Sequence, residues 1–222
     1  MTLYKDRLHC YNCYRPKVGC ICHSVEALPT QSCFVILMHE KEFRKTKNGT
    51  GRMTHLTLPN SHLFIGIDFS HHKRFNALLN NPLYKPFLLY PSDDAINLSQ
   101  TSLMLEDGVK PLFILIDSTW ACSKKMLRLS RNLHALPTVS FETTTPSKFS
   151  IKEQPNVNCL STIETSHKIL QLLNNHGVEN LHNSEIDTVL NPFYAMIDYQ
   201  VDASKVSNIR YKPQNQENMT RF

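Results

Sequence analysis

Apolar residues occur in short, dense runs, and the stretches between them carry a helix-like mixture of apolar and polar positions. The length of these runs and their β-branched and aromatic content are typical of buried strands. The predicted strands cover residues 33–39, 63–67, 86–90 and 112–116, with 136–141 as a further candidate. The most apolar run extends from Pro111 to Asp117, and it predicts a strand in the centre of a sheet.

Helical patterns follow several of these strands. Helices are predicted at 121–131, from 160–164 onward, and at 184–202 with an interruption near Pro192. Ser161 or Thr162 can cap the second of these helices, with Glu164 in its first turn. Short apolar strands that alternate with helices favour an α/β fold, in which a mostly parallel sheet has helices on both faces.

Composition narrows the class of protein. The chain has 222 residues, of which 41% are hydrophobic and 19% charged, as in an ordinary globular protein. We expect a cytoplasmic protein without a membrane segment, because no apolar run approaches a bilayer span and the polar N-terminus lacks a signal-peptide core. Only six glycines are present, without the spacing of a P-loop or of a dinucleotide-binding fingerprint, so the sequence argues against a P-loop NTPase and against a glycine-fingerprint Rossmann enzyme.

Four cysteines near the N-terminus form a Cys-x-x-Cys and a Cys-x-Cys pair. They are Cys10, Cys13, Cys20 and Cys22. Thiols stay reduced in the cytoplasm, and four thiolates suit tetrahedral zinc, so the cluster predicts a structural zinc site. Free or redox-active cysteines are the alternative, and His9 or His23 can replace one thiol.

Asp117, Thr119 and Trp120 lie at the turn between the most apolar strand and its helix. Ligands of open α/β sheets bind at such carboxyl ends of strands. We therefore predict these three residues as catalytic, with Asp117 as a general base. The alternatives are that Asp117 or Thr119 merely caps the helix and that the only tryptophan belongs to the core.

Basic residues gather in two places, a polar segment at 40–52 that we expect to be a loop and the helix that follows Asp117. With a formal net charge of +5, such surfaces suit a polyanion such as RNA, although any single cation is as well explained by a solvated helix face. The predicted RNA contacts are Arg44, Lys45, Asn48, Arg52, Lys124, Lys125, Arg128 and Arg131.

Several stretches together resemble the DTW-domain family. They are the cysteine pairs, Thr-Gly-Arg at 50–52, Leu-Tyr-Pro at 89–91, Asp-Ser-Thr-Trp at 117–120, Lys-Lys-Met-Leu-Arg at 124–128, Leu-Pro at 136–137 and Leu-Ser-Thr-Ile-Glu at 160–164. The resemblance runs from about Cys10 to Leu173. One departure is that Thr46 and Lys47 stand where the family more often has Pro-Ser, and Gly49 looks inserted.

The resemblance implies a tRNA-uridine aminocarboxypropyltransferase with a SPOUT-like fold, in which a knot is an open alternative. Such an enzyme transfers the 3-amino-3-carboxypropyl group of S-adenosylmethionine to N3 of a uridine in tRNA, forming acp3U and releasing methylthioadenosine. The implied cofactor contacts are Tyr90, Pro91, Ser92, Leu115, Ile116, Trp120, Leu160, Ser161, Thr162 and Glu164.

The resemblance also implies that the chain is divided into three parts. They are a zinc-binding segment at 1–30, a catalytic domain at 31–210 and a polar tail at 211–222. Two other functions stay open at this point: a SPOUT-type methyltransferase that uses the same cofactor, and a non-enzymatic zinc-containing module that binds RNA. The tRNA, the uridine and the choice between monomer and homodimer are not fixed by the sequence.

Overall fold

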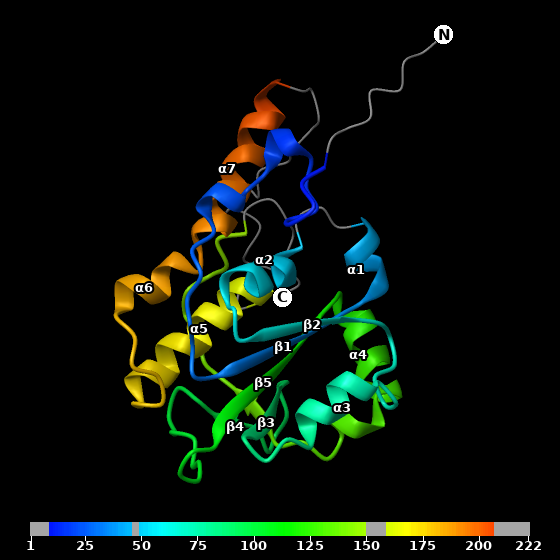
Figure 1. Cartoon of the computed structure of the whole chain (residues 1–222), viewed down its shortest axis with the longest axis vertical. Helices are drawn as coiled ribbons and strands as arrows, with labels where there is room; N and C mark the ends of the chain where they lie inside the picture. The colour runs from blue at the N-terminus through cyan, green and yellow to red at the C-terminus, as the bar shows by residue number, and fades with distance from the viewer. Residues whose placement is uncertain (1–8, 46–48, 150–158, 207–222) are drawn as a thin grey trace, which may run out of the picture.

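A computed structural model describes residues 9–45, 49–149 and 159–206, and Figure 1 shows its ribbon. In this part of the chain, six strands form one sheet in the order β2-β1-β5-β3-β6-β4. The strands are β1 (Cys33–Met38), β2 (Ser61–Ile65), β3 (Tyr84–Leu89), β4 (Ile96–Asn97), β5 (Lys110–Asp117) and β6 (Thr138–Ser140). Every strand pair is parallel, which confirms the predicted α/β class. Only the two-residue β4 was not predicted from the sequence.

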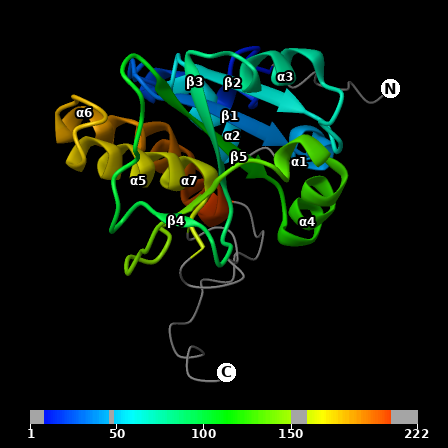
Figure 2. The same cartoon turned by 90° about the horizontal axis from the view of Figure 1, so that it is seen from below.

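Helices cover both faces of the sheet, as predicted. They are α1 (Glu40–Lys45), α2 (Thr50–Thr57), α3 (Lys73–Leu79), α4 (Trp120–Leu129), α5 (Thr162–Asn175), α6 (Asn183–Thr188) and α7 (Asn191–Val206). Alternate residues of a strand point to opposite faces. Phe34 and Ile36 therefore join the core beneath α2, α5, α6 and α7, whereas Val35 and Leu37 join the core beneath α3 and α4. Figure 2 shows α5, α6 and α7 on one side of the sheet and α3 and α4 on the other.

The segment expected to be a basic polar loop is helical in its described residues, and that prediction was wrong. Residues 40–45 form α1, where Glu40 and Arg44 pair at 3.9 Å across one turn. Thr50 begins α2, which buries Met53 and Thr54 against the sheet. Residues 46–48 lie outside the described residues, and so does the tail at 211–222.

The other predicted helices are present. The helix expected at 121–131 is α4, and a 3₁₀ turn at Arg131–Leu133 follows it. The interruption expected near Pro192 separates α6 from α7, and Pro192 occupies the first turn of α7, where a proline is tolerated. No described helix has the length and apolarity that crossing a bilayer requires.

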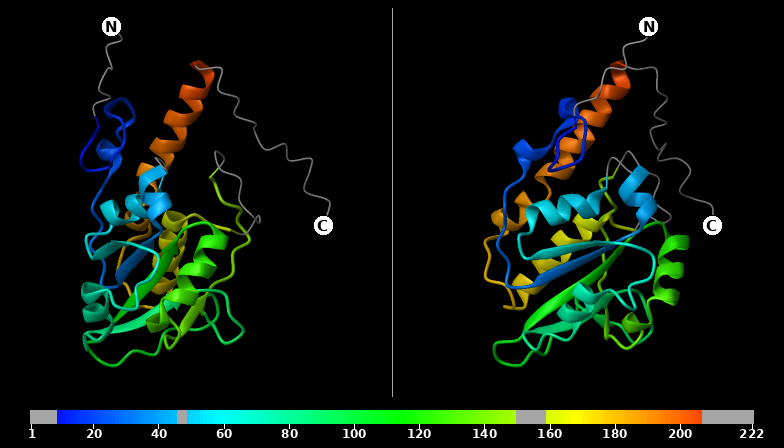
Figure 3. Two further views of the ribbon diagram at one scale, coloured as in Figure 1. Left: turned by 90° about the vertical axis from the view of Figure 1, so that its right-hand side faces the viewer. Right: turned by 45° about the vertical axis from the view of Figure 1, so that its right-hand side comes forward.

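The cysteine-rich segment lies beside α7 (Figure 3). Gly19 packs so closely on the Tyr199 ring that an added Cβ would lie 2.7 Å from it, so only glycine fits there. Buried Arg15 donates from Nε to the Gly19 carbonyl at 2.7 Å, and its guanidinium lies 5.7 Å from the centre of the same ring. The segment is therefore docked on the body of the protein through its backbone as well as its side chains.

Candidate functional site

A cleft of about 1050 Å³ opens at the carboxyl edge of the sheet, where β3, β5 and β6 end. The amino ends of α4 and α5 and the segment after β6 complete its walls. Parallel strands bring these chain turns to one edge, which is where open α/β sheets bind ligands. The lining residues are Thr50, Leu89–Pro91, Leu115–Ala121, Ser123, Val139–Thr144, Phe149, Cys159–Thr162 and Thr165.

The cleft brings together almost all of the residues predicted as catalytic or cofactor-binding. They are Tyr90, Pro91, Leu115, Ile116, Asp117, Thr119, Trp120, Leu160, Ser161 and Thr162. The remaining two, Ser92 and Glu164, do not line it. Ser92 is exposed, and its hydroxyl pairs with that of Thr138 at 2.6 Å.

Asp117 is the last residue of β5 and is half-buried in the wall of the cleft. Its Oδ1 accepts a hydrogen bond of 2.8 Å from the Thr162 hydroxyl at the start of α5. Its other oxygen approaches Gly51 in α2, where an added Cβ would collide with Oδ2 and lie 2.9 Å from Cγ. Two helix starts thus hold the carboxylate at a defined place beside the cleft. Capping of α4 is not its role, because Thr119 occupies that N-cap position.

Thr119 and Trp120 face solvent at the mouth of the cleft. Thr119 caps α4 without a side-chain hydrogen bond to the helix, and its carbonyl accepts from the Ser123 amide at 2.8 Å. Trp120 exposes 43% of its surface, so it is not a core residue. An exposed indole at a cleft mouth offers an apolar face on which a nucleobase can stack.

Glu164 has a structural position instead. It is 7% exposed, and its two carboxylate oxygens accept from the Ser161 amide and hydroxyl at 2.9 and 2.6 Å, the Ser147 hydroxyl at 2.7 Å and the Lys148 amide at 2.7 Å. Ser161 and Glu164 therefore form the capping box that the sequence allowed as an alternative. The same carboxylate fastens the segment after β6 to α5.

That segment supplies the lining residues that sequence reasoning missed. Phe141, Glu142, Thr143, Thr144 and Phe149 form one wall. The sequence contained a signal for these residues, because they come at or directly after the end of the strand candidate at 136–141. The carboxyl end of that strand lies at the same edge of the sheet as Asp117. Thr50, at the start of α2, had no such signal, since its segment was read as a loop. Cys159 also lines the cleft.

The predicted RNA contacts lie in different environments. Lys124, Lys125, Arg128 and Arg131 are exposed on α4 and the turn after it. Arg44 is exposed and paired with Glu40, and Lys45 ends α1. Asn48 lies outside the described residues.

Arg52 differs from the other predicted RNA contacts because it is enclosed. Its guanidinium lies 4.3 Å from the centre of the Phe43 ring and 4.9 Å from that of Tyr14, and it donates to the Phe43 carbonyl at 2.5 Å. Burial lowers the pKa of Arg52, and the charges of Tyr14 and Asp117 oppose that shift. Arg52 therefore connects the cysteine-rich segment, through Tyr14, to α1, through Phe43.

The four N-terminal cysteines converge and could hold a metal ion. Their sulfur atoms all lie within 4.8 Å of one another, with Cys10 and Cys22 3.6 Å apart and Cys13 and Cys20 3.8 Å apart. Four thiolates around a zinc ion at about 2.3 Å require separations of about 3.8 Å, so the donor set fits a tetrahedral ion. Hydrogen bonds from the Cys13 and Asn12 amides lower the pKa of the Cys10 thiol to about 6, whereas burial raises the pKa of the Cys22 thiol to about 12.

Comparison with known proteins agrees with the resemblance found in the sequence. The DTW domain model matches residues 7–201. The tRNA-uridine aminocarboxypropyltransferase 2 of Drosophila melanogaster is 30% identical over 91% of this chain and 78% of its own length. Proteins of the same name from Macaca fascicularis and Mus musculus are 27% and 28% identical, over 89% and 88% of this chain and 65% and 64% of their own lengths. No solved structure matches significantly. The chain belongs to the DTW-domain family.

Proposed function

We propose that this protein transfers the 3-amino-3-carboxypropyl group of S-adenosylmethionine to N3 of a uridine in tRNA, forming acp3U and releasing methylthioadenosine. The observation that carries the proposal is the Asp117 carboxylate, held by Thr162 in the wall of a large cleft at the carboxyl edge of the sheet. Relatives named tRNA-uridine aminocarboxypropyltransferase 2 support the same activity.

The cleft has room for both reactants. Small-molecule sites usually measure about 300–1000 Å³, and this one, at about 1050 Å³, suits a nucleoside donor together with an extruded nucleotide. We assign the adenine to the backbone of the turn at Tyr90 and Pro91, with Leu115 and Ile116 as the apolar wall. Leu160 and Ser161 are the opposing contacts for the donor. The SPOUT relationship and a knot stay predictions from the resemblance.

Asp117 is the general base in this proposal. S-adenosylmethionine supplies an electrophilic carbon beside its sulfonium, and the pocket decides which of the three such carbons meets the nucleophile. Uridine N3 carries a proton and is a poor nucleophile until that proton leaves. The Asp117 carboxylate takes it, while the Thr162 hydroxyl fixes the orientation of the carboxylate. Trp120 offers the stacking surface for the uridine, and Thr119 is a candidate partner for the donor carboxylate.

The exposed cations form the proposed tRNA surface. Lys124, Lys125 and Arg128 are exposed along α4 and Arg131 in the turn after it, and Arg44 on α1 is a further exposed cation. Such residues bind phosphates and set the position of the RNA without reading its sequence.

A zinc ion held by the four N-terminal thiolates is the proposed structural cofactor, because their spacing fits it. It would fold the segment at 1–30 onto the catalytic domain at 31–210.

Nucleoside mass spectrometry tests the reaction. Purified protein is incubated with S-adenosylmethionine and bulk tRNA that lacks acp3U, and the digested tRNA is analysed. We expect a new acp3U peak that Asp117→Ala abolishes and that Asp107→Ala, an exposed carboxylate in the turn before β5, leaves unchanged. A methylated nucleoside would identify a methyltransferase instead. Binding of tRNA without any new nucleoside would favour a non-enzymatic module.

A further inference from the structure

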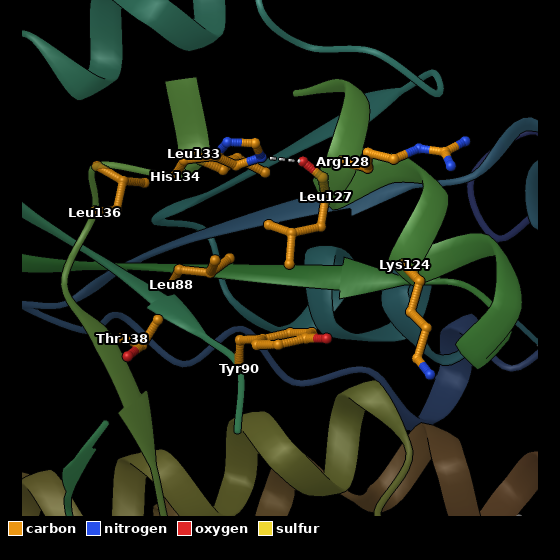
Figure 4. Close-up of a pocket in the computed structure, with 9 residues that line it drawn as sticks. All are labelled: Leu88, Tyr90, Lys124, Leu127, Arg128, Leu133, His134, Leu136 and Thr138. Atoms are coloured by element: carbon orange, nitrogen blue, oxygen red, sulfur yellow. Dashed lines mark hydrogen bonds between the residues drawn. The ribbon is translucent and has the colours of Figure 1, made fainter. Parts of the chain in front are cut away.

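A second cavity, of about 410 Å³, lies between α4, the end of β3 and the start of β6 (Figure 4). Its lining residues are Leu88, Tyr90, Lys124, Leu127, Arg128, Leu133, His134, Leu136 and Thr138. Tyr90 is the one residue that it shares with the large cleft. The proposed function uses the backbone at Tyr90 and counts Lys124 and Arg128 among the tRNA-binding cations, but it assigns no ligand to this cavity.

The floor of this cavity is apolar and firmly packed. Leu88 and Leu133 are 2% and 1% exposed, and Leu127 and Leu136 are half-buried around them. His134 Nε2 forms a hydrogen bond of 2.7 Å with the Leu127 carbonyl, which ties the turn after α4 back to the helix (Figure 4, dashed line). The floor is therefore built from residues that pack in the body of the fold, and the turn after α4 closes one side of it.

The rim of the cavity is cationic and includes an aromatic ring. Lys124 and Arg128 are exposed on α4. Neither of them forms a salt bridge within the part of the chain that the structure describes. Tyr90 is half-buried, and its ring extends from the end of β3 into the same space (Figure 4). No carboxylate lines the cavity. An apolar floor and an aromatic ring suit a nucleobase, and the unpaired cations suit the phosphate attached to it, so together they match a nucleotide.

We propose that this cavity binds one nucleotide of the tRNA, the neighbour of the uridine that enters the large cleft. Its base lies on Tyr90 and the leucine floor, and its phosphate faces Lys124 and Arg128. This inference rests on the proposed function, because it takes the large cleft as the place of the target uridine.

The geometry of α4 supports adjacent nucleotides. Trp120, Ala121 and Ser123, in the first turn of α4, line the large cleft. Lys124, Leu127 and Arg128, in the next turns, line the second cavity. A strand of RNA that crosses the helix therefore meets the two sites in succession, with Tyr90 as their common wall. Separate binding sites for two consecutive bases would keep the target uridine unstacked from its neighbour.

The test uses abasic substrates and the wild-type protein. The modified uridine is first located by mass spectrometry, and tRNAs are then made with an abasic nucleotide on its 5′ or its 3′ side. We expect one of the two to lose about 5- to 150-fold in kcat/KM, which is the range of base–aromatic stacking. Equal kcat/KM for both abasic tRNAs and the intact tRNA would overturn the proposal. Absence of acp3U with intact tRNA would instead reject the proposed function.

Variants of the cavity test the same site from the protein side. Leu136→Trp fills the cavity, and it should lower kcat/KM for intact tRNA about 10-fold while the abasic substitution costs nothing further. Lys124→Gln combined with Arg128→Gln should raise KM for tRNA and reduce the dependence of that KM on salt. The matched control is Lys73→Gln with Arg74→Gln, two exposed cations of α3, which should leave KM for tRNA unchanged. A raised KM for S-adenosylmethionine in Leu136→Trp, or losses that add to those of the abasic tRNA, would contradict a nucleotide site. If Leu136→Trp does not fold, the proposal is tested by the double variant of Lys124 and Arg128 and by the abasic tRNAs.

Discussion

The Thr162 hydroxyl donates a hydrogen bond of 2.8 Å to Oδ1 of Asp117, joining the end of β5 to the first turn of α5 across 45 residues of chain. This bond ties the orientation of the proposed base to the start of α5, where Ser161 and Thr162 line the cleft. A carboxylate whose orientation is fixed by such a contact can meet the proton it removes in a defined geometry, as general-base catalysis requires.

Thr162→Val should therefore impair the reaction more than the fold. Loss of a hydrogen bond to a charged group costs about 1.5–3 kcal/mol, which corresponds to about 10- to 150-fold in kcat. Thr162→Ser keeps the donor and should retain most of the activity. The measurement is acp3U formation at saturating tRNA and S-adenosylmethionine. Wild-type kcat in Thr162→Val would mean that this bond does not position the base.

Gly51→Ala should displace the same carboxylate from its other side. The new Cβ would collide with Asp117 Oδ2 and lie 2.9 Å from Ile36 Cγ2, and neither neighbour is the end of a long flexible chain. We expect a loss of at least about 10-fold in kcat together with a destabilisation of about 1–3 kcal/mol from overpacking. Gly66→Ala is the control, since its Cβ would meet only the Phe69 ring, at 3.3 Å. Equal activity of the two variants would contradict the tight approach of α2.

Much of this site was predictable, because strand ends are visible in a sequence. The apolar run that ends at Asp117 and the turns at Tyr90 and Ser161 each follow or flank a recognisable element. Parallel strands then bring these ends to one edge without any long-range information. The resemblance to DTW-domain proteins, which the family comparison confirms, supplied the reaction that such a cleft would carry out.

The parts that were missed depend on tertiary contacts. Residues 40–45 and 50–57 are polar enough to be read as a loop, but burial of Met53 and Thr54 against the sheet stabilises α2. Arg52 is predicted as an RNA contact from its charge, and the fold adds what the sequence could not show, namely its contacts with the rings of Phe43 and Tyr14. Glu164 looked equally suited to a ligand, and only the fold shows the donors that occupy its oxygens.

Glu164→Gln should affect stability rather than the affinity for the donor. A buried carboxylate that accepts from Ser161, Ser147 and Lys148 cannot be matched by an amide, whose NH₂ group faces donors. The expected cost is about 1–3 kcal/mol in the free energy of unfolding, measured by denaturant titration. Glu185→Gln, in the exposed capping box of α6, should cost less. A large rise in KM for S-adenosylmethionine without loss of stability would restore the ligand role.

Arg52→Lys should destabilise the contact between the cysteine-rich segment and α1. An ammonium cannot stack between Phe43 and Tyr14 as the planar guanidinium does, so we expect a loss of about 0.5–2 kcal/mol. The change is read from thermal unfolding beside Arg44→Lys, an exposed arginine of α1. A higher KM for tRNA with unchanged unfolding would show that Arg52 contacts RNA instead.

Protein purified without added metal should contain about one zinc ion per chain, as expected for a closed four-thiolate site. Cys20→Ser should remove the ion, whereas Cys122→Ser, on α4 and outside the cluster, should keep it. Loss of zinc should also lower Tm by about 4–10 °C, the shift expected for a few kcal/mol in a domain of this size. The reason is that the segment packs Tyr14 on Arg52 and Gly19 on Tyr199, so its unfolding exposes both contacts. Elemental analysis that finds no zinc in the wild-type protein would reject the site.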